Sequence, residues 1–174
     1  MKTTMFVAAL WLALAASSAQ AQARQTLSDQ ECLQIFPRAD ACQAGNRLNG
    51  KMYWEAWNTG YNDDADKLLG YIFLAPFTGE GSELELVVGV TTQGTISKVK
   101  LRGVAGVSEE FFAQFEGKSL RFEFEIAKTL EDLLFVPAKI KAQAGKHQLC
   151  EIIVMELRAL SGLAMKSPSL SFAK

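Results

Sequence analysis

GYIFLAPFTGEGSELELVVGVTTQGTISKVKLRG, residues 70–103, contains the patterns of three consecutive β-strands. Tyr71 to Phe77 is a dense apolar run. From Leu84 to Val90, leucines and valines recur at every second position, which gives this strand one apolar face. Ile96 to Leu101 is a third segment rich in β-branched residues, and Gly94 before it can take the positive φ of a tight turn. We therefore predict a hairpin of the second and third strands, with the first as an antiparallel neighbour.

Upstream of this stretch, the sequence predicts a short helix and an extended segment. The helix is expected from Leu27 to Ile35, with Ser28 as its N-cap and Glu31 completing a capping box. Tyr53 to Trp57 is aromatic and is expected to be extended, and a polar loop follows as far as Lys67.

Downstream, the sequence predicts a helix, a strand and a final helix. Ser108 is expected to cap a short helix whose phenylalanines belong to the core, namely Phe111, Phe112 and Phe115. Apolar and charged residues alternate from Ser119 to Lys128, which is typical of a half-solvated antiparallel strand. Gln148 to Leu160 has an apolar stripe at helical spacing. The predicted fold class is α+β: a twisted antiparallel sheet with short helices and a C-terminal helix packed on it.

Residues 1–21 have the features of a secretory signal peptide. Lys2 precedes an apolar run from Phe6 to Ala16, and small residues in A-x-A spacing follow. The alternative is an uncleaved anchor, but the run is shorter than the ~20 residues that span a bilayer. We expect the mature protein to be periplasmic or secreted, without a transmembrane span.

The charge and the acidic residues exclude some kinds of partner. Removing residues 1–21 from the 174-residue chain leaves 153 residues with a formal charge of −2, because Lys2 is the only charged residue removed. This near-neutral balance has no basic run that would bind nucleic acid. The acidic residues Asp63, Asp64 and Asp66 lack the pattern of a calcium-binding loop, so a solvated turn is favoured over a metal site.

Three cysteines bear on the compartment and on chemistry. An exported location permits a disulfide, and the preferred pair is Cys32 with Cys42, ten positions apart. Cys150 lies in an apolar helical run, where a cysteine usually serves as a small buried hydrophobe. No pattern of nucleophile and base occurs, so enzymatic activity is uncertain and an electron carrier or binding module is favoured.

The order of several short motifs resembles the periplasmic FMN-binding domain family. The stretch 70–103 contains G-Y-x-F, a short glycine loop, V-V-G-V and G-x-I-x-x-V-x-L; F-P-R-A-D precedes it at 36–40 and Q-F-E-G-K-S follows at 114–119. The family includes the flavoprotein subunits of Rnf and Na+-translocating quinone reductase complexes. The resemblance covers Phe36 to Leu160. It divides the mature chain into an N-terminal helical segment (22–52), an FMN-binding-like domain (53–162) and a flexible tail (163–174).

The resemblance also implies where a flavin would bind. In the family, the FMN phosphate is often attached to a threonine of an S-G-A-T segment that opens the last helix. Ala144 to His147 stand there in this chain, and no Ser or Thr occurs from 130 to 160, so that covalent attachment is not expected. Non-covalent FMN at the helix N-terminus would involve Gly145, Lys146 and His147. The alternative is a surface loop in which Lys146 and His147 are solvated.

These observations leave two classes of function open. The first is an exported FMN-binding-like domain that holds flavin non-covalently and exchanges electrons with a membrane-bound or periplasmic redox protein. The second is a flavin-free binding or assembly module of the same fold in the periplasm, which the lost hydroxyls favour. The family's E-T-P-G segment after the hairpin is also replaced, by Ala105 to Ser108. A different small molecule in the same pocket is a third possibility.

Overall fold

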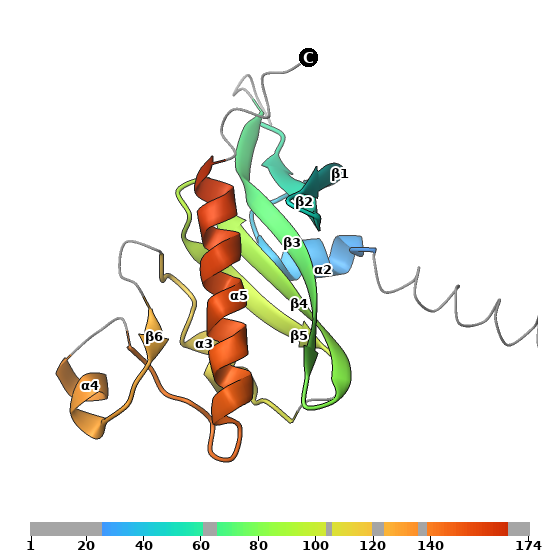
Figure 1. Ribbon diagram of the computed structural model, residues 1–174. Helices are drawn as coiled ribbons and strands as arrows, with labels where there is room; N and C mark the ends of the chain where they lie inside the picture. Colours follow the sequence, from blue (N-terminus) through green and yellow to red (C-terminus); the bar gives the residue numbers. More distant parts are fainter. Residues whose placement is uncertain (1–25, 61–65, 104–105, 120–123, 136–138, 167–174) are drawn as a thin grey trace, which may run out of the picture.

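The fold is mixed α+β, as predicted. In the computed structural model, the described residues are 26–60, 66–103, 106–119, 124–135 and 139–166. Their main feature is a five-stranded antiparallel sheet in the order β1-β2-β3-β4-β5. Helix α5 lies across one face and α2 lies on the other (Figure 1). The strands are β1 (Ala41–Leu48), β2 (Lys51–Asn58), β3 (Lys67–Gly79), β4 (Ser82–Thr91) and β5 (Ile96–Arg102).

The three strands predicted from residues 70–103 are β3, β4 and β5. Their pairing is antiparallel throughout, with Phe73 opposite Val88 and Val88 opposite Val99. The β3–β4 connection is a two-residue turn in which Glu80 (φ 51) and Gly81 (φ 75) both have positive φ, the geometry that matches strand twist. Gly94 (φ 78) turns the chain from β4 into β5, as predicted.

Strand β1 was not predicted. Its sequence, ACQAGNRL, has no β-branched or aromatic residue, so local pattern gave no indication of a strand. It forms because the next segment, predicted correctly as extended, is β2, which pairs with β1 across the two-residue turn of Asn49 and Gly50. The described part of the predicted N-terminal helical segment (22–52) therefore also contributes a strand to the sheet.

Helix α5 (His147–Lys166) covers the larger core. It begins near the predicted position and continues past Gly162, so residues 163–166 of the predicted tail are helical. Leu157 and Leu160 are fully buried against the sheet, and the Ser161 hydroxyl donates a hydrogen bond to the Gly94 carbonyl. Residues 167–174 of the tail and the predicted signal peptide lie outside the described residues.

Helix α2 (Asp29–Ile35) covers the other face with the predicted cap. The Glu31 N–H donates to Ser28 Oγ at 3.2 Å, and the Ser28 N–H donates to Glu31 Oε2 at 3.1 Å. Two further links hold α2 on the sheet: the predicted Cys32–Cys42 disulfide, and a 2.7 Å hydrogen bond from the Ser97 hydroxyl to the Ile35 carbonyl. Cys150 is free and buried, also as predicted.

The segment after β5 contains four small elements: α3 (Glu109–Ala113), β6 (Glu125–Ile126), α4 (Leu130–Phe135) and β7 (Lys139–Ile140). The predicted phenylalanines of α3 are in the core. Ser108 is at the N-cap, but the predicted capping bond is absent. Hydrogen bonds from the Glu110 backbone N–H and from the Ser108 side chain instead lower the pKa of the Glu110 carboxyl.

The predicted antiparallel strand from Ser119 to Lys128 is confirmed only in part: Ser119 forms an isolated antiparallel bridge with Thr95, but β6 does not pair antiparallel. Residues 120–123 lie outside the described part of the chain, and β6 pairs parallel with β7. Phe124 and Ile126 are buried, so the predicted apolar face holds where it is described. Alternation determines which side chains face the core, but it carries no information about the partner strand.

Among the described residues, no helix is long and apolar enough to cross a membrane.

Candidate functional site

A cleft of about 770 Å³ lies between β5 and α3. Its apolar part is made by Val99 and Leu101 from the strand together with Val107 and Phe112. Val99 and Phe112 are buried, and Leu101 and Val107 are partly buried against the main core. Ligand pockets typically measure about 300–1,000 Å³ and are mostly apolar. The cleft thus has the volume of a small-molecule site, although about half of its lining is polar.

The two walls of the cleft differ in charge. The β5 wall carries Lys98 and Lys100, and the Lys100 ammonium donates a hydrogen bond to the amide oxygen of Gln34 from α2. The opposite wall carries Glu109 and Glu116. Within the described ranges, no ion pair is found for any of these four charged residues. A polar ligand would therefore meet cations on one wall and carboxylates on the other.

Gln143, which lies just before α5, forms side-chain hydrogen bonds to residues at one end of the cleft. Gly106 lines the cleft with φ 61, and its carbonyl accepts a hydrogen bond from Gln143 Nε2 at 2.7 Å. The same Gln143 side chain accepts a 2.7 Å hydrogen bond from the Ser108 N–H. No local pattern pointed to Gln143, because its partners lie more than thirty positions away.

The predicted site residues Gly145, Lys146 and His147 lie together at the start of α5. Gly145 has φ 73, a conformation that glycine adopts without strain, and the Lys146 carbonyl accepts the first helical bond, from the Cys150 N–H at 2.9 Å. A Cβ placed on Gly106 would lie 3.8 Å from Lys146 Cε. The structure therefore brings the helix start beside the Gly106 end of the cleft.

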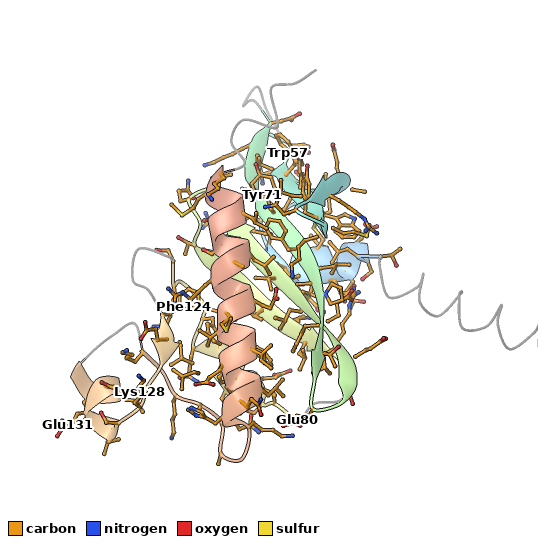
Figure 2. All side chains as sticks on the ribbon, in the orientation of Figure 1. Trp57, Tyr71, Glu80, Phe124, Lys128 and Glu131 are labelled. Carbon is orange, nitrogen blue, oxygen red and sulfur yellow. A yellow bond between two sulfur atoms is a disulfide. The ribbon has the colours of Figure 1, made fainter. Side chains whose placement is uncertain are left out.

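Two carboxylates accompany these site residues. Lys146 Nζ forms an ion pair with Glu80 Oε2 from the β3–β4 turn, and His147 Nε2 lies 3.3 Å from Glu151 Oε1. Figure 2 shows Glu80 at the same end of the molecule as the first turn of α5. Because Glu80 is 66 positions from Lys146, sequence spacing did not indicate this contact. A phosphate arriving at the helix start would have to compete with Glu80 for Lys146.

Cys150, in the first turn of α5, does not serve as a ready nucleophile. Burial raises the pKa of its thiol, although hydrogen bonds from the N–H groups of Gln143 and Cys150 itself oppose the rise. The thiolate is the reactive form, so a raised pKa keeps the side chain inert. In the part of the chain that the structure describes, no group of three His, Cys, Asp or Glu side chains could hold a metal ion. Asp63 and Asp64 lie outside that part.

Comparison with protein-family models gives no match for this chain, and comparison with the sequences of curated proteins gives none either. The resemblance to the FMN-binding domain family thus depends on the short motifs alone. The structure assigns three motif residues a packing role on the α2 face: Phe36, Gly70 and Gly89. A Cβ on Gly70 would lie 2.8 Å from Phe36 Cζ, and one on Gly89 would lie 3.2 Å from Phe36 Cε2. These glycines make room for the phenylalanine, which supports a role in folding.

Proposed function

We propose that this protein is an exported domain that binds FMN non-covalently and exchanges electrons with a membrane-bound or periplasmic redox protein. The observation that carries the proposal is the junction at Gly106. There the cleft meets the start of α5, and Gln143 bonds to both Gly106 and Ser108. In the family that this chain resembles, the cofactor is contacted by the segment after the hairpin, which is 105–108 here, and by the segment that opens the last helix, which is 144–147 here.

The cleft fits a flavin ring better than the helix start fits its phosphate. Leu101 and Val107, which are only partly buried, provide apolar surface that would hold a planar ring and exclude water from one side. At the helix start, Glu80 and Glu151 place carboxylates beside Lys146 and His147. A bound flavin would supply redox chemistry, whereas the protein would supply position and electrostatics. We accordingly propose a carrier and not an enzyme.

The second candidate is a flavin-free binding or assembly module, and the Glu80–Lys146 ion pair favours it. That pair already gives the Lys146 ammonium a carboxylate partner, as a phosphate would. The packing of Phe36 between Gly70 and Gly89 is a reason to keep those motif residues without any cofactor. This candidate predicts the same fold with a cleft that binds part of another protein.

Native mass spectrometry with a visible spectrum, on protein purified from its own periplasm and after addition of FMN, tests the proposal. We expect an adduct of FMN mass that is lost on denaturation. Ala113→Trp, which adds an indole to the α3 wall of the cleft, should abolish the adduct. The matched control is Met155→Trp on the exposed face of α5, where 70% of the side chain is accessible. A colourless protein that stays at its bare mass with excess FMN would favour the flavin-free module.

A further inference from the structure

We infer that the cleft binds a phosphate monoester through Lys98 and Lys100 of β5, and not through the start of α5. The inference rests on the proposed function, because the ligand it concerns is the phosphate of a bound FMN. It differs from what the sequence resemblance implies, which is a phosphate held by Gly145, Lys146 and His147.

Lys98 and Lys100 are spaced to act on one anion. The β4–β5 register is regular from the Gly89–Lys98 pair to the Val87–Lys100 pair, so both lysines extend from the same face of the strand. Residues two apart on a strand are about 6.6 Å apart, a span that a phosphate can bridge with two flexible ammonium groups. Both side chains line the cleft and both residues are partly buried.

The charges of these two lysines are not neutralised by the described residues around them. Lys100 donates to the amide oxygen of Gln34, which is uncharged, and no ion pair of Lys98 is found in the described ranges. Arg102, the next basic residue on the strand, differs because it binds Glu31 at 2.7 Å and Glu85 at 2.8 Å. A phosphate dianion accepts strong charge-assisted hydrogen bonds. Its negative charge between the two ammonium groups would also reduce their mutual repulsion.

The opposite wall and the helix start are less suited to the same group. Lys98 and Lys100 lie on the α2 face of β5, where Lys100 contacts Gln34, whereas Val99, Leu101 and Phe112 belong to the α5 face. Because Glu109 and Glu116 on the α3 side would repel a phosphate, the phosphate should lie on the α2 side of this edge strand, with the ring reaching over its edge toward Leu101. At the helix start, a phosphate would lie near the carboxylates that contact Lys146 and His147. Electrostatics therefore favours the lysine pair over the helix start as the phosphate position.

Fluorescence titrations with FMN and with riboflavin, which lacks the phosphate, test the inference on the native protein and on lysine variants. We expect FMN to bind at least about tenfold more tightly than riboflavin, because a hydrogen bond to a charged group is worth about 1.5–3 kcal/mol. Lys98→Met and Lys100→Met should each weaken FMN binding about tenfold and leave riboflavin binding unchanged. Lys67→Met, at an exposed position at the start of β3 outside the cleft, is the matched control and should change neither affinity, whereas Lys146→Met tests the rival phosphate position at the helix start.

Two results would overturn the inference and leave flavin binding intact: equal affinities for FMN and riboflavin, or loss of FMN affinity in Lys146→Met with retention in both β5 variants. Binding of neither flavin to the native protein would overturn the proposed function and the inference with it. Thermal unfolding of each variant checks that the fold is kept. Lys98→Arg and Lys100→Arg, which keep the charge, should retain most of the preference for FMN.

Discussion

The two faces of the sheet are stabilised in different ways. The cluster on the α5 face contains 23 of the described buried residues, and the cluster on the α2 face contains 9. On the α2 face, a disulfide, a capping box and the Arg102 ion pairs supplement that smaller cluster. A seven-residue helix cannot bury enough apolar surface to remain docked without such links. The comparison shows that the disulfide lies on the face where burial is least, whereas ion pairs occur on both faces: those of Arg102 on the α2 face, and Lys51–Glu156 and Lys146–Glu80 at α5.

The largest effect is expected from the α5 face. Phe73→Ala should destabilise the protein by about 4 kcal/mol, because it removes a fully buried aromatic side chain that contacts Tyr53 and Tyr71. Ile72→Ala, one position away on the opposite face, is the matched control and should cost less, about 2–3 kcal/mol. Urea unfolding measures both. If Ile72→Ala loses as much unfolding free energy as Phe73→Ala, or more, burial on the α2 face contributes at least as much to stability as burial on the α5 face.

An intermediate effect is expected from the disulfide. The Cys32→Ala/Cys42→Ala double variant should lose about 3 kcal/mol, since the bridge closes a short loop in the unfolded chain. We expect the loss to appear first as faster hydrogen exchange in α2, with β3 and β4 still protected. Equally fast exchange in α2 and in the central strands would indicate that the α2 face is not separately stabilised.

The smallest effect is expected from Glu31. Burial alone would raise the pKa of Glu31, but hydrogen bonds from Arg102 and Ser28 and the Arg102 charge bring it below its ordinary value of 4.5. A lowered pKa in the folded state stabilises the protein above the ordinary pKa, and this contribution is lost as the pH falls through the folded pKa. Unfolding midpoints of the native protein and Glu31→Gln should therefore differ at pH 7 and converge as the pH falls below the lowered pKa of Glu31. A difference that does not change with pH would contradict this.

The parts of the fold that the sequence predicted are those determined by local pattern. Strand β3 follows from a dense apolar run, β4 from alternating apolar residues and β5 from a segment rich in β-branched residues, and the α2 cap follows from Ser28 and Glu31 three positions apart. Strand β1 was missed because it forms through pairing with β2 and not through its own β-propensity. The parallel pairing of β6 with β7 was missed because the choice of partner depends on the whole fold.

The candidate site was predicted only in its local part. Gly145, Lys146 and His147 lie at the start of α5, where the motif placed them. Glu80 and Gln143 change what that site can bind, and both act through contacts with distant segments. The cleft is lined mainly by residues of β5 and α3, with Gln34 from α2. Their sequence patterns are the same as those of ordinary strand and helix residues, so they did not indicate a binding site.

The two-residue turns at Asn49–Gly50 and Glu80–Gly81 bear on how the chain folds. They join strands that are adjacent both in sequence and in the sheet, so most strand contacts have low contact order, which is associated with fast folding. Docking of α5 onto β3 and β4 closes a much longer loop of the chain, and it therefore costs more conformational entropy. We expect the β3–β4 hairpin to be in the folding nucleus and α5 to dock late. Pulse-labelled hydrogen exchange during refolding would show protection in β3 and β4 before α5, and the reverse order would place the nucleus in the helix.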